Sequence, residues 1–133
     1  MKTQLFLGLC GLLLCSACEK KSDLPAGQYE LSFGEKIELN GTEVEFFAVQ
    51  DSRCPWDAIC VWEGEAEVSL RLYQQEEIAA EFTLTYAGLC SEDCGSSEKV
   101  LGREYTLLDV SPYPGLTNMP IPEGDYVIVL KVD

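Results

Sequence analysis

The sequence predicts an all-β fold: a single-domain antiparallel β-sandwich or partly open barrel of about seven strands over residues 27–133. Three observations lead to this prediction. Apolar and polar residues alternate in most segments beyond residue 27, which is the pattern of a strand with one buried face. Turn signals separate these segments. No segment of the region has a sustained helical period with caps, so we expect at most a turn or two of helix.

The first strands are predicted between residues 29 and 48. Alternation covers 29–33 and 37–39, then resumes over 44–48 after Asn40-Gly41. Asn-Gly between two alternating runs is a strong hairpin signal, because a type I′ turn requires a positive φ at both central residues. We therefore expect a β-hairpin that turns at residues 40–41.

Four further strands follow along the chain. Residues 66–72 and 78–86 alternate and are joined by Gln74-Gln75-Glu76-Glu77, which predicts a second hairpin. The remaining strands are expected at 105–110 and 125–132. The last is apolar on both faces, which favours a central position in its sheet.

The charge of the chain excludes some classes of partner. It carries 23 acidic and 9 basic residues and no histidine, a formal net charge of −14. Such a protein repels phosphate backbones, so we expect no binding to nucleic acid.

The first 17 residues have the features of an export leader. Lys2 precedes an apolar run over residues 5–14 that is too short to span a bilayer as a helix. The run ends at Cys15-Ser16-Ala17-Cys18, which resembles the bacterial lipobox. The resemblance implies cleavage before Cys18 and lipid attachment to its sulfur. Cys15 is a second candidate, and an ordinary secretory leader cut near Ala17 is the alternative to a lipid anchor.

An anchor at Cys18 predicts the organisation and location of the protein. Residues 18–26 are polar and suit a tether between the lipid and the folded domain at 27–133. We expect a lipid-anchored protein of the cell envelope, at the bacterial outer membrane. The mixed charge of residues 19–23 favours the periplasmic side.

Four further cysteines, Cys54, Cys60, Cys90 and Cys94, lie in the predicted domain. An even number outside the cytoplasm predicts two disulfides, and local pairing is favoured because each pair lies within one predicted loop. Zinc is the alternative, but only Cys90 and Cys94 have a spacing typical of zinc ligands. A cysteine nucleophile would have no histidine to activate it.

Residues 51–64 form the most distinctive segment, a cysteine-closed loop between two predicted strands. Its Asp-Ser-Arg-Cys-Pro opening and later Cys-Val-Trp-x-Gly resemble a signature of small, uncharacterised bacterial lipoproteins. Residues 111–114 and the final strand fit the same resemblance, which implies export and an all-β domain and leaves the activity open.

The same segment supplies the candidate binding loop, whose residues are Asp51, Arg53, Trp56, Asp57, Trp62 and Glu63. Trp62 is expected to face the core and pack on the disulfide, whereas Trp56 is the tryptophan expected to meet a ligand. Arg53 can reach Asp51 or Asp57, and Gly64 allows close approach to a neighbouring backbone.

No cofactor is expected, with Ca²⁺ as the alternative. Glu43 and Glu45 share one strand face, and residues 63, 65 and 67 share another, so pairing of these strands would gather carboxylates. No Asp-rich calcium loop is present, which favours a solvated polar face instead.

Three functions remain open at this stage. The first is a non-catalytic binding or structural module of the envelope, with a protein or glycan partner. The second is a glycoside hydrolase working with two carboxylates. The third is a protease inhibitor that acts through its loops, by analogy of fold alone. No catalytic residue is assigned.

Overall fold

The structure, a computed structural model, describes residues 23–133. The predicted leader, the lipid site at Cys18 and most of the tether lie outside the described residues. No helix within residues 23–133 is long and apolar enough to cross a membrane.

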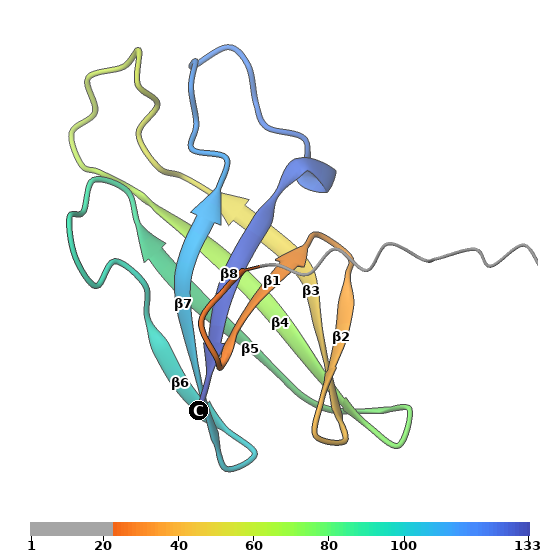
Figure 1. The fold of residues 1–133 in the computed structure, drawn as a ribbon. Coiled ribbons are helices and arrows are strands. Elements are labelled where there is room, and N and C mark those ends of the chain that lie inside the picture. The colour runs from red at the N-terminus through yellow and green to blue at the C-terminus, as the bar shows by residue number, and fades with distance from the viewer. Residues whose placement is uncertain (1–22) are drawn as a thin grey trace, which may run out of the picture.

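Eight strands and one short 3₁₀ turn make up the fold (Figure 1). They are β1 (Gln28–Ser32), β2 (Lys36–Leu39), β3 (Thr42–Asp51), β4 (Glu65–Gln74), β5 (Glu77–Ala87), β6 (Ser97–Val100), β7 (Arg103–Ser111), the 3₁₀ turn η1 (Glu123–Asp125) and β8 (Val127–Val132). All seven predicted strands are present. The eighth, β6, lies in a segment for which we predicted no strand.

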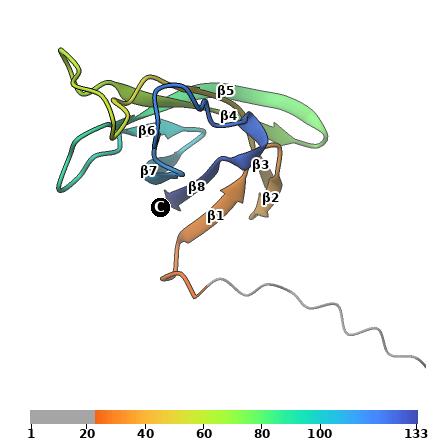
Figure 2. The same ribbon diagram turned by 90° about the horizontal axis from the view of Figure 1, so that it is seen from above.

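The strands form two antiparallel four-stranded sheets, which confirms the sandwich and excludes the partly open barrel. One sheet has the order β1-β8-β7-β6 and the other β2-β3-β4-β5. Figure 2 shows the two sheets as separate layers. β8 is paired on both sides, by β1 and β7, which confirms its predicted central position in the sheet.

Both predicted hairpins are confirmed. Asn40 and Gly41 have φ angles of 52° and 85°, as a type I′ turn requires, and join β2 to β3. Gln75 and Glu76 adopt φ angles of 52° and 65° between β4 and β5. Tight turns therefore fix the register of these strands at one end of the sandwich.

The core lies between the two sheets. Phe46, Leu70 and Leu130 have no exposed surface, and the ring of Phe82 lies 5.2 Å from that of Tyr105 in the facing sheet. Burying one such side chain contributes about 1.5–3 kcal/mol, so this interface supplies most of the stabilisation of the fold.

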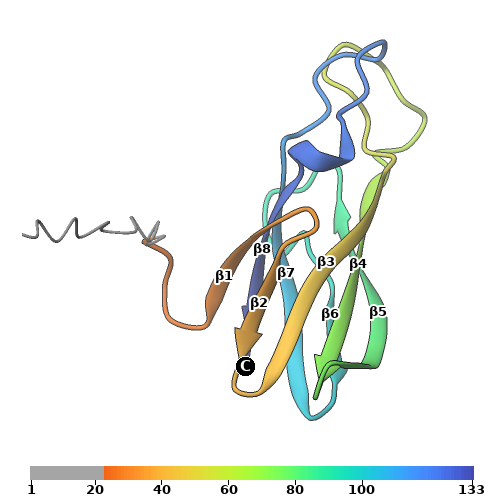
Figure 3. The same ribbon diagram turned by 90° about the vertical axis from the view of Figure 1, so that its right-hand side faces the viewer.

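The two ends of the sandwich differ. The β2–β3, β4–β5 and β6–β7 turns and the C-terminus lie at one end, and the long connections β3–β4, β5–β6 and β7–β8 lie at the other (Figure 1, Figure 3). The amide of Val132 donates to the carbonyl of Gly27 (2.9 Å), so the chain enters the fold beside the C-terminus. The N-terminal entry and the long loops are therefore at opposite ends.

Candidate functional site

The candidate site is the end of the sandwich formed by residues 52–64, 88–96 and 112–122, which we call the loop end (Figure 1). The amide of Gly88 donates to the carbonyl of Gly64 (2.9 Å), so two of the loops leave the sheets side by side.

A buried arginine ties the first loop to the opposite sheet. Arg53 is 3% exposed; its Nε and Nη2 donate to the two carboxylate oxygens of Asp51, at 2.9 and 2.7 Å. Nη1 donates to the carbonyl of Val110 (2.8 Å) and Nη2 to that of Pro112 (2.9 Å). The planar guanidinium thus makes a bidentate pair with a carboxylate and also donates to two carbonyls. Lysine cannot reproduce this geometry.

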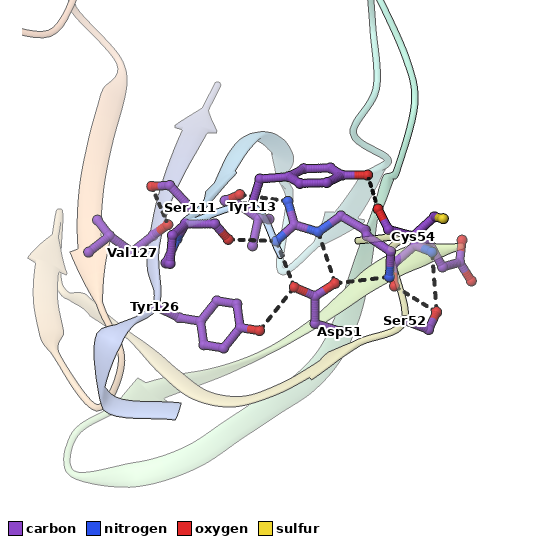
Figure 4. Close-up of polar contacts among 11 residues, drawn as sticks. Asp51, Ser52, Cys54, Ser111, Tyr113, Tyr126 and Val127 are labelled. Atoms are coloured by element: carbon purple, nitrogen blue, oxygen red, sulfur yellow. Dashed lines mark hydrogen bonds and ion pairs between the residues drawn. The ribbon is translucent and has the colours of Figure 1, made fainter. Parts of the chain in front are cut away.

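Asp51 has a second partner, because the hydroxyl of Tyr126 donates to its Oδ2 at 2.9 Å (Figure 4). Burial, and secondly the hydrogen bond to this carboxylate, raise the pKa of Tyr126 above its ordinary value near 10. The sequence left Asp51 and Asp57 as possible partners of Arg53, and in the structure Arg53 pairs with Asp51. The cluster joins β3 to the start of β8 and holds the base of the loop end.

The first and third loops also contact each other directly. The hydroxyl of Tyr113 donates to the carbonyl of Cys54 (2.7 Å), and the amide of Trp56 donates to the carbonyl of Pro114 (3.2 Å). The rings of Trp56 and Tyr113 lie 4.8 Å apart, and the guanidinium of Arg53 lies 4.9 Å from the centre of the tyrosine ring. Tyr113 is therefore packed between a buried cation and an exposed indole.

Asp57 connects the same two loops nearer the surface. Its Oδ1 accepts hydrogen bonds from the amide and the hydroxyl of Thr117, at 2.8 and 2.6 Å. Residues 60 positions apart are thereby held together, and the two loops form one unit.

The base of the first loop requires glycine at position 64. Gly64 has a φ of +69°, and a Cβ there would lie 1.9 Å from the carbonyl oxygen of Ser52. The close backbone approach expected from the sequence is thus present.

Both disulfides are local. Cys54 is bonded to Cys60 within the first loop, and Cys90 to Cys94 within the second. This is the pairing that the sequence favours, and it engages the thiols that a zinc site would need.

The expected role of Trp62 is wrong. Instead of packing on the disulfide in the core, its side chain is 79% exposed. Residues 58–62 lie outside both sheets, and β4 begins only at Glu65, so Trp62 has no core position available. Tyr113 and Arg53 occupy the space beneath the loop instead. Trp56 is 71% exposed, in agreement with the prediction that it is accessible.

The loop end gathers exposed apolar side chains. Of nine large apolar side chains that are exposed within residues 23–133, seven lie on its three loops. They are Trp56, Ile59, Val61, Trp62, Leu89, Leu116 and Met119. We call these seven residues the apolar tip. A shallow pocket of about 310 Å³, lined by Ile59, Val61, Trp62 and Leu89 among others, connects the first two loops.

The calcium alternative draws on acidic residues of β3 and of the segment that enters β4. β3 and β4 pair, but their register places Glu45 opposite Arg71 and Glu67 opposite Gln50. The two acidic sets therefore lie at different heights along the sheet. Within the described part of the chain, no three potential metal ligands form a group. Glu63 is exposed and follows Trp62 in the first loop, outside both strands.

A second open pocket, of about 270 Å³, lies between the first and third loops and is lined by Leu116, Met119 and Tyr126 among others. Its two carboxylates are Asp51 and Glu123. Both oxygens of Asp51 accept hydrogen bonds from Arg53, so this carboxylate is paired with the arginine.

Sequence reasoning missed the residues of the third loop that complete the site. Tyr113 and Thr117 hold the first loop, and Leu116 and Met119 extend the apolar tip. Tyr126, which lies just before β8 and was also missed, binds Asp51 at the end of β3. The available signal was composition: prolines disfavour a central strand over residues 112–122, so apolar residues there are more often exposed than those of the strands.

Comparison with protein-family models, curated proteins and solved structures gives no match.

Proposed function

We propose that this protein is a lipid-anchored lipoprotein of the cell envelope that binds a protein partner through its loop end, without catalysis. The observation that carries the proposal is the concentration of seven exposed apolar side chains on three loops at one end of the sandwich. Exposed apolar side chains concentrated in this way are typical of interaction sites.

The order within the loops supports a binding role. Two disulfides, the Arg53–Asp51 pair and the Asp57–Thr117 hydrogen bonds hold the loops. A surface that is ordered before binding loses less conformational entropy on association, which raises affinity.

The chemistry of the apolar tip favours a protein over a glycan. Ile59, Val61, Leu89 and Leu116 are aliphatic and offer no hydrogen bonds to sugar hydroxyls. Tryptophan and methionine, which complete the tip together with these residues, are enriched in protein interfaces.

Position-specific photo-crosslinking in the producing cells tests the proposal. A photoreactive residue at position 59 or 61 is expected to capture a discrete protein. The same residue at 75 or 76, in the exposed turn at the other end, serves as the matched control. Equal capture from both ends would contradict a binding role of the loop end.

Lipid labelling tests the anchor separately. Cys18→Ala is expected to abolish incorporation of a labelled fatty acid, and Cys15→Ala is expected to retain it. Labelling that persists in Cys18→Ala and is lost in Cys15→Ala would move the lipid to the other cysteine.

A further inference from the structure

From the shape and charge of the loop end we infer that its partner offers a concave apolar cleft bordered by lysine and arginine, which receives the tip around Ile59–Trp62. This inference rests on the proposed function and specifies the chemistry of the partner.

The shape of the tip indicates a concave partner. Ile59 and Val61 are each 105% exposed, as much as in an extended peptide, and flank Cys60. Cys60 is bonded to Cys54, which is 8% exposed and therefore anchored in the body of the domain. Two aliphatic side chains thus project from a point that the disulfide holds in place. A flat surface would contact only their ends, whereas a cleft could bury both.

The charge around the tip indicates a basic border. The exposed charged residues of the three loops are Asp57, Glu63, Glu92 and Asp93. The one cation of the three loops, Arg53, is buried and paired with Asp51. Facing charges of opposite sign accelerate encounter and suppress wrong partners, so the complementary rim is cationic.

The same charges argue against two other occupants. A second copy docked tip to tip would bring two sets of four acidic residues together, and facing like charges are destabilising. A bilayer rich in anionic headgroups would meet the same repulsion, and the loops expose no lysine or arginine to offset it.

Selection from a phage-displayed library of random peptides tests the inference. The target is the full chain carrying Cys18→Ala, which lacks the attachment site of the lipid. We expect the selected peptides to combine aliphatic or aromatic residues with flanking lysine and arginine. Their binding should weaken at least tenfold in the Ile59→Ser/Val61→Ser variant, because apolar anchors at the centre of an interface dominate affinity.

Matched variants separate the contribution of the apolar side chains to binding from that of the charges. Glu63→Gln, Glu92→Gln and Asp93→Asn are each expected to weaken binding about two- to fivefold at low salt and to reduce its salt dependence. Controls remote from the tip are Ile78→Ser and Leu101→Ser for the apolar term and Glu76→Gln for the charge term, which are expected to leave binding unchanged. An unchanged urea midpoint establishes that each variant is folded.

Four results would overturn the inference: peptides without enriched basic residues, no ligand for the loop end, a blue shift of tryptophan emission on phosphatidylglycerol or phosphatidylcholine vesicles, or dimerisation at micromolar concentration. The crosslinking experiment tests the proposed function independently of these four results. Suppose that position 59 captures a protein but the selected peptides lack basic residues. The proposed function would then be supported, and the inference of a basic cleft would be refuted.

Discussion

Replacing Arg53 by methionine should be among the most damaging single substitutions in the domain. The side chains of Arg53 and Asp51 are 1% and 6% exposed, and the guanidinium also binds the carbonyls of Val110 and Pro112. Methionine fills much of the volume but leaves a buried carboxylate without its counter-ion. Breaking a buried pair in this way costs about 3–5 kcal/mol. The total stability of a domain is about 5–15 kcal/mol, so the loss is a large fraction of it.

Urea unfolding followed by tyrosine and tryptophan fluorescence measures this effect. With a slope of about 2 kcal/mol per molar urea, the midpoint should fall by roughly 2 M. Arg71→Met is the matched control, since Arg71 pairs with Glu45 and Glu81 on the outer face of a sheet, where water screens the charges. Its midpoint should change far less.

A double-mutant cycle tests the cause. Asp51→Asn combined with Arg53→Met removes both charges, so it should destabilise less than the sum of the two single substitutions. A midpoint for Arg53→Met within about 0.3 M of the parent, or strict additivity in the cycle, would refute the role assigned to the pair.

Three further predictions concern the same end of the fold. Gly64→Ala should cost more than about 2 kcal/mol in urea unfolding, because the new Cβ meets the Ser52 carbonyl at 1.9 Å and φ is +69°; near-parental stability would contradict the close approach. Stability should be level up to about pH 9 and fall above about pH 10, because the raised pKa values of Tyr126, Tyr86 and Tyr105 keep these groups protonated in the folded state after the unfolded state has lost the protons, with Tyr126 shifted most. Tyr126→Phe should flatten this alkaline slope, and an unchanged slope would assign it to other groups. Replacing both Cys54 and Cys60 by alanine should cost about 2 kcal/mol and speed proteolysis within residues 54–60, and equal cleavage rates would show that the disulfide does not order the loop.

Local rules predicted the strands well, since the signals for them lie within a few residues. Asn40-Gly41 encodes its own turn through positive φ angles, and the doubly apolar pattern of β8 encodes its central position. β6 was missed because its four residues, Ser97–Val100, carry no clear alternation. Its turn places Leu101, which is not a typical turn residue, at a φ of +49°.

The candidate site was harder to predict because its contacts are distant in sequence. Arg53 and Asp51 are two residues apart, and their pairing was within reach of the sequence. The carbonyls that complete the arginine's environment lie at Val110 and Pro112, and no local pattern indicates them. Trp62 was misplaced for a related reason: a large apolar side chain predicts burial on average, yet its position depends on where β4 begins.

Gly27, where the chain enters the fold, and the apolar tip lie at opposite ends, which leads to one last prediction that depends on the proposed anchor at Cys18. The chain enters the fold at Gly27, beside Val132, whereas both tryptophans of the chain lie on the loop end. β3 alone has 10 residues, which is about 33 Å at about 3.3 Å per residue. The tip should therefore stand away from the bilayer that holds the lipid, where it is accessible to another envelope protein.

Quenching by brominated phospholipids measures this separation in the lipidated protein reconstituted into vesicles. Trp56 and Trp62 should show the same emission with and without bromine. A matched variant in which both are phenylalanine and Leu101 is tryptophan carries its reporter at the opposite end, where Leu101 is half exposed, and should be quenched more. Equal quenching of the two proteins would mean that the domain lies along the membrane, and the apolar tip would then be explained by contact with lipid instead of with a protein.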